Sequence, residues 1–300
     1  MSIPAETPTP RTSTVTASDG VTLAVYEYGD PEHPTVVAVH GYPDDHRVWD
    51  CIVALIADRF HLVTYDVRGS GASSAPAGRA GYRIPQLVAD LGAVIEATVP
   101  TTAGPVHLLA HDWGSIQSWD ALTDPATRDR IASYTSISGP SLDMAGRWLR
   151  ERGHLGATAK QLSASYYVFA FQAPWLPEAL VRRGVLARLV ALSKKGGRDA
   201  RPTERTMVER DAINGLELYR ANFTGRMVRP RTARIAVPVQ VLAPRHDAHV
   251  TVDLQCGAPA PYVADLRTHV IAGNHWVVEQ DPELIVEHLT SFLDSLAGGS

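Results

Sequence analysis

The stretch of sequence that decides the fold is Val106-His107-Leu108-Leu109-Ala110-His111-Asp112-Trp113-Gly114-Ser115. An apolar run that is typical of a buried strand ends at a polar residue, Asp112, and a helical pattern follows at once. Ala110 and Gly114, two places before and after Asp112, are small enough for a sharp turn that lifts one side chain above a sheet. The sequence therefore predicts a nucleophile elbow with Asp112 at its apex.

The residue type at the apex indicates the chemistry. A serine there would predict an esterase, whereas an aspartate attacks saturated carbon, opening an epoxide or displacing a halide, and forms an alkyl-enzyme ester. That ester must be hydrolysed, which requires a base to activate water and an acid to orient the base. In this arrangement the partners follow the nucleophile in the order Asp or Glu, then His.

Two loops near the C-terminus can supply these partners. Ala272-Gly273-Asn274-His275-Trp276 follows the last predicted strand, so we expect His275 above the sheet as the base. Pro244-Arg245-His246-Asp247 follows an earlier strand, which makes Asp247 the first choice for the orienting acid. Asp143, which follows the strand at 131–138, competes for that role.

Charge that develops during ester hydrolysis needs backbone donors aimed at it. We expect one donor to be the amide of Trp113 and the other to be the amide of Tyr42, in the loop His40-Gly41-Tyr42-Pro43. Tyr42-Pro43 is a candidate cis peptide. The run Tyr65-Asp66-Val67-Arg68-Gly69-Ser70-Gly71 also follows a strand, and we predict structural roles for its Asp66 and Arg68 side chains.

Strand and helix patterns alternate along the chain, which favours an α/β fold with a mostly parallel sheet covered by helices on both faces. The predicted strands are Thr22–Tyr28, Thr35–His40, His61–Tyr65, Val106–Ala110, Ile131–Ser138, Val237–Ala243 and Leu266–Ile271. The predicted helices are His46–Ala57, Ile84–Val99, Ser115–Leu122 and Pro282–Leu296.

The alternation breaks between about Gly139 and Pro238, which predicts a helical insertion. Residues 140–234 hold 18 Lys and Arg against 8 Asp and Glu, a balance of +10, so the rest of the chain carries −14 of the net charge of −4. Two interpretations remain open for this basic insert. Its arginines are simply solvated on outer helix faces, or they attract an amphiphilic or anionic substrate or an acidic partner surface.

Composition bounds the remaining possibilities. The chain has 300 residues, 45% of them hydrophobic, and its negative net charge gives no general attraction to nucleic acid. Two cysteines are too few for a disulfide framework or a four-ligand zinc site. No signal peptide and no run of about 18 apolar residues is visible. We therefore expect a cytoplasmic protein with no membrane-spanning segment, whose residues 1–12 form a flexible tail.

These motifs together resemble the α/β-hydrolase-fold epoxide hydrolases, over residues 14 to 296. HGYP, D-x-R-G-x-G, AHDWG, Asp247 and NHW occur in the order of that family, with Ala110 at a position that is usually glycine. The chain also resembles the hydrolase portion of bacterial proteins that fuse this fold to a short-chain dehydrogenase module. No such module follows here, so we expect either a stand-alone relative or a shortened form.

The resemblance implies an eight-stranded sheet, a core at residues 13–138 and 235–297, and a helical cap at 139–234. It also implies two cap tyrosines that protonate the epoxide oxygen: Tyr167, with Tyr166 as an alternative, and Tyr219. The expected reaction converts a small apolar or amphiphilic epoxide into a vicinal diol without a metal or organic cofactor. A monomer or a homodimer is expected.

Two rivals remain. Haloalkane dehalogenases share the aspartate and the histidine, but they usually carry Asn where Tyr42 stands, and fluoroacetate-type dehalogenases carry Arg where Trp113 stands. Both differences favour the epoxide. A catalytically silent ligand-binding protein of the same fold is the other rival, although a pure binder has no need of Asp112, Asp247 and His275 together.

Overall fold

The computed structural model describes residues 7–194 and 206–298. One sheet of eight strands runs through the molecule in the order β1-β2-β4-β3-β5-β6-β7-β8, with β1 and β2 antiparallel to their neighbours and the other pairs parallel. The strands are β1 (Arg11–Thr16), β2 (Thr22–Tyr28), β3 (Thr35–Val39), β4 (His61–Tyr65), β5 (Val106–His111), β6 (Ile131–Ile137), β7 (Val239–Pro244) and β8 (Leu266–Ile271).

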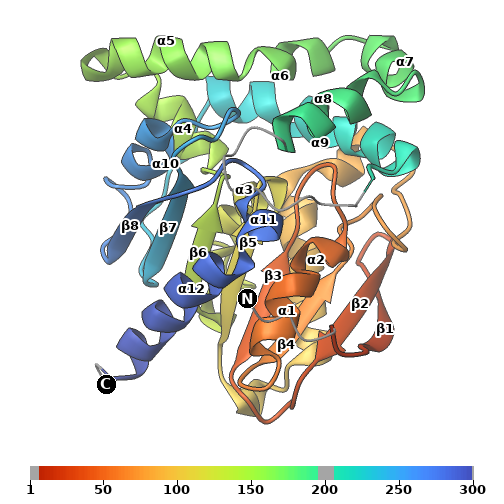
Figure 1. Ribbon diagram of the computed structural model, residues 1–300, viewed down its shortest axis with the longest axis vertical. Helices are drawn as coiled ribbons and strands as arrows, with labels where there is room; N and C mark the ends of the chain where they lie inside the picture. Colours follow the sequence, from red (N-terminus) through yellow and green to blue (C-terminus); the bar gives the residue numbers. More distant parts are fainter. Residues whose placement is uncertain (1–6, 195–205, 299–300) are drawn as a thin grey trace.

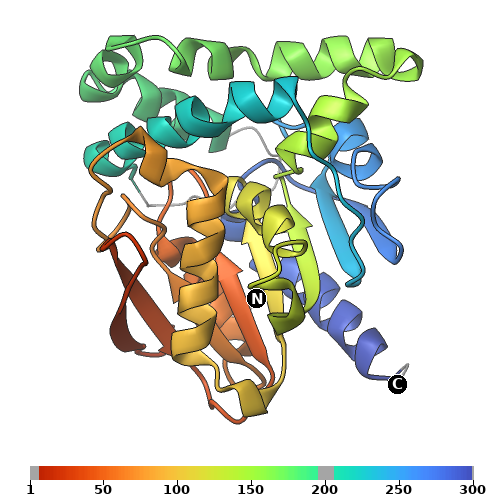
Figure 2. The ribbon, with the colours of Figure 1, turned by 180° about the vertical axis from the view of Figure 1, so that it is seen from behind.

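Helices cover both faces of this sheet, as the sequence predicts. Figure 1 shows one face behind α1 and α12, and Figure 2 shows the opposite face behind α2 and α3. Each face has its own cluster of buried apolar side chains, and every residue of β3 and β7 is buried. These helices are α1 (Asp50–Ile56), α2 (Ile84–Thr98), α3 (Trp113–Ala121), α10 (Val252–Gly257), α11 (Val277–Gln280) and α12 (Pro282–Ala297).

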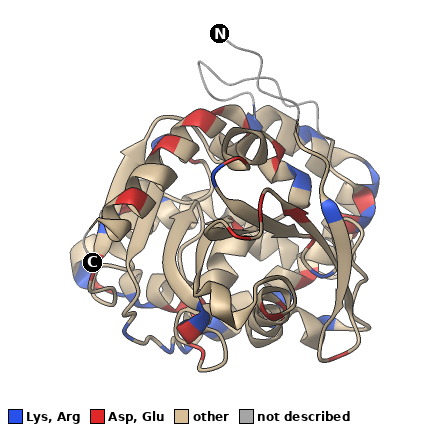
Figure 3. Ribbon diagram, turned by 90° about the horizontal axis from the view of Figure 1, so that it is seen from below, with Lys and Arg blue, Asp and Glu red and all other residues tan. Residues whose placement is uncertain are grey.

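Between β6 and β7 the described residues form helices and loops that lie across the top of the sheet (Figure 1). The helices are α4 (Leu142–Trp148), α5 (Leu155–Ala164), α6 (Tyr166–Phe171), α7 (Leu176–Arg182), α8 (Val185–Lys194) and α9 (Glu209–Val228). Helix α9 packs against α4, α6 and α7, and it also contacts the short helix at Arg79–Tyr82 on the core. Seen from below, acidic and basic residues are distributed around the molecule (Figure 3).

Strand β1 is not among the strands predicted from the sequence. Residues 1–12 were expected to form a flexible tail, but β1 begins at Arg11 and pairs with β2 from Arg11 to Thr16. The strand is almost entirely exposed and polar, because an edge strand is stabilised by backbone hydrogen bonds to one neighbour and needs no apolar pattern. The tail prediction for residues 1–6 lies outside the described residues.

Candidate active site

Asp112 lies on a strained turn between β5 and α3. Its backbone has φ 52° and ψ −123°, a conformation that non-glycine residues rarely adopt. The turn is possible because Gly114 comes close to β3, where an added Cβ would lie 2.2 Å from the carbonyl oxygen of Val39. Ala110, at the position usually held by glycine, is fully buried within β5. The local sequence thus raises the carboxylate of Asp112 above the end of the sheet.

Two backbone amides face this carboxylate. The Tyr42 amide donates to Oδ1 of Asp112 at 2.6 Å, and the Trp113 amide also stabilises the charged carboxylate, which opposes the rise in its pKa that burial causes. An added Cβ at Gly41 would lie 2.4 Å from Oδ1, so a larger residue there would occupy the space of the carboxylate. The Tyr42–Pro43 peptide is cis. The two amides predicted from sequence therefore converge on Asp112.

The predicted base and acid also lie at this end of the sheet. Nε2 of His275 is 3.6 Å from Oδ2 of Asp112, and its Nδ1 is 3.1 Å from Oδ2 of Asp247. Oδ1 of Asp247 accepts the amides of His249 at 2.8 Å and Val250 at 3.0 Å, which fixes the carboxylate. The three side chains form a chain of contacts in the order Asp112, His275 and Asp247, which is the order expected for a nucleophile, a base and an orienting acid.

The competing acid, Asp143, is used elsewhere. It is buried, forms an ion pair with Arg226 of α9, and accepts the backbone amide of Arg231 at 2.6 Å. Its hydrogen bonds tie α4 to α9 and to the segment that follows α9. The structure therefore brings Asp247, and not Asp143, to His275.

Burial and charge set the ionisation of the site. Burial raises the pKa of Asp112, although His275 and the two amides oppose this effect. Burial also acts to raise the pKa of Asp247, but the charge and hydrogen bond of His275 outweigh it and lower that pKa to about 2. For His275, burial lowers the pKa, yet Asp247 and Asp112 together raise it to about 9. His275 is consequently protonated in the free protein at neutral pH.

A pocket of about 550 Å³ separates Asp112 from the helices above the sheet. Tyr167 of α6 and Tyr219 of α9 line it, with ring centroids 6.1 Å apart, whereas Tyr166 is 69% exposed and points away. Burial, together with the negative charge of Asp112, raises the pKa of both pocket tyrosines, so both stay protonated. The rest of the lining is mostly apolar and includes Ile116, Leu142, Leu149, Val168, Phe223 and Met227.

Two histidines that the sequence analysis did not select contact this site. His249 lines the pocket, with its ring centroid 4.7 Å from that of His275 and 5.3 Å from that of Tyr167. Nε2 of His111 lies 2.8 Å from the carbonyl oxygen of His275 and supports its loop. Burial lowers the pKa of His249 to about 4 and that of His111 to about 3. The sequence offered one signal for each of them. His249 stands two residues after Asp247, and His111 stands directly before Asp112.

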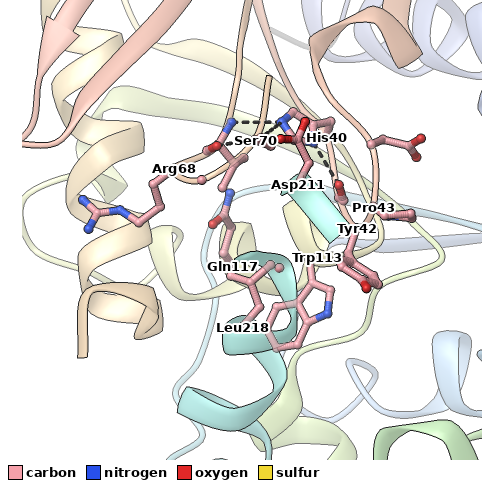
Figure 4. A pocket seen from close by; sticks show the side chains of 14 residues that line it. His40, Tyr42, Pro43, Arg68, Ser70, Trp113, Gln117, Asp211 and Leu218 are labelled. Carbon is pink, nitrogen blue, oxygen red and sulfur yellow. Dashed lines mark hydrogen bonds between the residues drawn. The ribbon is translucent and has the colours of Figure 1, made fainter. Parts of the chain in front are cut away.

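Arg68 is placed as the sequence predicted. Its buried guanidinium pairs with Asp90 at 2.6 Å and with Asp19 at 2.7 Å. It lies beside a second pocket of about 360 Å³, in which Figure 4 shows Tyr42 and Trp113 on one side and His40 and Ser70 on the other. Trp113 lines both this pocket and the one above Asp112.

Asp66 also belongs to the scaffold. It accepts the amide of Ala72 at 2.7 Å, and its carboxylate lies 2.7 Å from Nδ1 of His46. Within the described residues, Asp45, His46 and Asp66 are the one group of three or more potential metal ligands whose ligand atoms all lie within 4.8 Å of one another. Tyr26 stacks on His46 and donates to Asp66, so these side chains are already engaged in loop hydrogen bonding.

The comparisons with known proteins agree with this fold. Residues 34–173 match the model of the alpha/beta hydrolase fold family. A crystal structure of an epoxide hydrolase from Bacillus megaterium superimposes with a TM-score of 0.77 at 22% identity, covering 95% of this chain and all of the other. The fold and the site therefore define an α/β-hydrolase-fold protein.

Curated proteins with similar sequences give more detail than the fold alone. The chain is 35% identical over 298 residues to the "Probable oxidoreductase EphD" of Mycobacterium tuberculosis, covering 95% of this chain and 50% of that protein. It is 25% identical to "Epoxide hydrolase 3" of Mus musculus, covering 94% and 76%. The chain is therefore an α/β-hydrolase-fold protein whose sequence is similar to that of an epoxide hydrolase. It spans about half the length of the mycobacterial relatives that it matches.

Two further observations concern membrane-spanning helices and disulfide bonds. Among residues 7–194 and 206–298, no helix has both the length and the apolar character that crossing a membrane requires. Cys51 and Cys256 form no disulfide.

Proposed function

We propose that this chain is an epoxide hydrolase that works through a covalent ester on Asp112. The observation that carries the proposal is the arrangement of the Asp112 carboxylate, with Oδ1 held by the Tyr42 amide, Oδ2 near His275, and Tyr167 and Tyr219 across the pocket. In this mechanism Oδ2 attacks an epoxide carbon while the carbon–oxygen bond breaks. One tyrosine donates a proton to the departing alkoxide oxygen, and the proton of His275 replaces it.

The proton balance explains why one histidine serves both half-reactions. In the free enzyme His275 is protonated, because its pKa of about 9 lies well above neutral pH. Ester formation removes the charge of Asp112, which makes His275 a weaker base and releases its proton to the tyrosine. Neutral His275 then takes one proton from water while the resulting hydroxide attacks Cγ of Asp112 and forms a tetrahedral intermediate. The bond between Cγ and the substrate oxygen breaks, and the remaining proton of the water passes from the new carboxyl group to the departing alkoxide. A vicinal diol leaves, and Asp112 is again a carboxylate. His275 ends the cycle protonated, as it began.

The amides of Tyr42 and Trp113 stabilise the oxyanion that forms when hydroxide attacks the ester. Removing one such donor typically costs about 10²-fold or more in rate. Asp247 holds the His275 ring through Nδ1, so Nε2 faces Asp112. Every step in this scheme uses side chains and amides of the chain.

We further propose that residues 139–234 act as a cap on a core formed by residues 13–138 and 235–297. The apolar lining of the pocket supports a small apolar or amphiphilic epoxide as the substrate. The two cysteines without a disulfide support a cytoplasmic location.

A single turnover in heavy-oxygen water tests the covalent mechanism. The first diol should contain no label from water, and the label should enter Asp112, because the diol takes its new oxygen from the carboxylate. Label that appears directly in the first diol would mean that water attacks the epoxide itself. A panel of epoxides and matched alkyl halides tests the reaction class. Halide release without epoxide opening would favour the dehalogenase alternative.

A further inference from the structure

The outward side of α5 and α6 carries a stripe of large apolar side chains. Leu155 and Leu162 on α5, and Tyr166 and Phe169 on α6, are separated by 7, 4 and 3 residues, the spacing of one side of a helix. All four are exposed, with 69% of Leu155 and 65% of Phe169 accessible to solvent. This is the spacing of a buried helix face, yet here the face is open to solvent.

Exposed large apolar side chains also occur on the two helices that follow. Trp175, directly before α7, is 82% exposed and has a left-handed backbone with φ 61°. Leu176, Leu189 and Leu192 are also exposed. Eight of the eleven exposed large apolar residues in the described chain therefore lie between residues 155 and 192. We call these eight residues the outer cap face: Leu155, Leu162, Tyr166, Phe169, Trp175, Leu176, Leu189 and Leu192.

Positive charge accompanies this apolar surface. Residues 151–192 contain five Lys and Arg, all exposed, and two acidic residues: Glu151, which is exposed and lies 3.5 Å from Nδ1 of His154, and Glu178, which pairs with Arg220 of α9 at 2.6 Å. The five basic residues are Arg152, Lys160, Arg182, Arg183 and Arg188. A second copy of the chain that docked through the same face would bring the same positive charge against it. An apolar and basic surface is complementary to a surface that is apolar inside and negatively charged outside.

We propose that the outer cap face binds the surface of an anionic lipid bilayer. The leucines, Phe169 and Trp175 enter the boundary between headgroups and acyl chains, and the arginines lie at the level of the lipid phosphates. Tryptophan suits this position because its ring is apolar and its N–H can remain hydrated. The proposal does not depend on the proposed catalytic activity, because it concerns side chains on the side of the helices opposite the pocket.

The same helices line the active-site pocket with their inward side. Gln161, Ser165, Tyr167 and Val168 of α5, α6 and the turn between them face the pocket above Asp112. A bilayer bound to the outer cap face would therefore lie one helix layer from the candidate active site. This arrangement favours substrates that dissolve in membranes.

Tryptophan fluorescence tests lipid binding directly. The other five tryptophans are buried, so Trp175 is the single exposed tryptophan of the chain. We expect vesicles of phosphatidylcholine mixed with phosphatidylglycerol to shift the emission to shorter wavelength, and Trp175→Phe to abolish the shift. Vesicles of phosphatidylcholine alone should bind much more weakly, and salt should release the protein from the anionic vesicles.

Variants locate the binding surface. In vesicle co-sedimentation, Leu162→Ser/Phe169→Ser and Arg182→Gln/Arg183→Gln should each lower the partition coefficient by about tenfold or more. Matched controls on the core are Val270→Ser, at an exposed residue of β8, and Arg128→Gln, at an exposed arginine before β6. Unchanged melting temperatures of the variants show that the fold is intact.

Three outcomes would overturn the proposal. The first is that anionic vesicles neither shift the emission nor sediment the folded wild type. The second is that the cap variants bind as tightly as the core controls. The third is that Trp175 emission is already shifted without lipid and moves back on dilution, which would show that a second copy covers the face.

Discussion

Ester formation on Asp112 should change the charge of His275, and the Asp112→Asn variant isolates this effect. Oδ2 of Asp112 lies 3.6 Å from Nε2 of His275. Burial lowers the pKa of His275, but Asp247 and Asp112 raise it to about 9. An asparagine, like an ester, carries no charge at this position. The variant therefore represents the electrostatic state of the intermediate.

The expected size of the change follows from the distance. Two unit charges about 4 Å apart interact by about 4 kcal/mol at an effective dielectric constant of about 20. Because about 1.4 kcal/mol corresponds to one pKa unit, removing the charge of Asp112 can lower the pKa of His275 by up to about three units. Asp247 remains 3.1 Å from Nδ1 and preserves part of the elevation. We expect the pKa to fall by at least about one unit.

An NMR titration of isotope-labelled histidines measures this pKa, and His275→Gln identifies the resonance. Asp253→Asn is the matched control, because it removes one exposed carboxylate on α10. In wild type and control His275 stays protonated until the pH approaches about 9, whereas in Asp112→Asn it loses its proton at lower pH. A His275 pKa that remained near 9 in Asp112→Asn would refute the proposed change of charge on ester formation.

Three further predictions concern the cap tyrosines and two buried ion pairs. Tyr167→Phe and Tyr219→Phe should each slow ester formation from an epoxide by about 10²-fold in stopped-flow kinetics. The double variant should be almost inactive, with an unchanged melting temperature. A normal rate of ester formation in the double variant would exclude both tyrosines from the mechanism. Lys194 at the end of α8 pairs with Glu279 at 2.6 Å and lies over the Trp276 ring beside His275, so Lys194→Met should slow ester hydrolysis more than ester formation. Arg79→Met, which breaks a more exposed ion pair with Glu217, is the control for that variant, and equal effects on both steps would contradict a positioning role for Lys194. Arg68→Met leaves Asp90 buried without its cation and should lower the free energy of unfolding by about 3 kcal/mol or more in urea denaturation; a change below about 1 kcal/mol would show that the ion pair does not stabilise the fold.

Much of the fold could be predicted from the sequence, because the strands of a parallel sheet with helices on both faces are continuous apolar runs. The predicted strands agree with the structure to within about two residues at their ends, and β5 and β8 lead into the predicted loops of Asp112 and His275. The predicted helix at His46–Ala57 divides into a short 3-10 turn at His46–Trp49 and helix α1. Strand β1 was missed, because its pairing is a property of the backbone and leaves no apolar pattern in Arg11–Thr16.

The sequence by itself determined the residues that meet at the end of the sheet. The elbow is a local property of small residues around Asp112, and parallel strands deliver their following loops to the same edge. Asp247 and Asp143 both follow strands, so this rule could not choose between them. Only the tertiary structure shows which of the two carboxylates contacts His275. Asp143 is bound by Arg226 and the Arg231 amide, whereas Asp247 lies next to His275.

The direction of side chains in the helical insert was likewise decided by tertiary structure. Tyr166 and Tyr167 are adjacent in sequence and differ by about 100° around the axis of α6. One faces solvent and the other faces Asp112, depending on how α6 lies over the pocket and against α9. The apolar spacing from Leu155 to Phe169 predicts a covered helix face. The spacing alone does not indicate whether another part of the chain or a different molecule covers it. That face is left outward because α5 packs against α10 and α6 packs against α9.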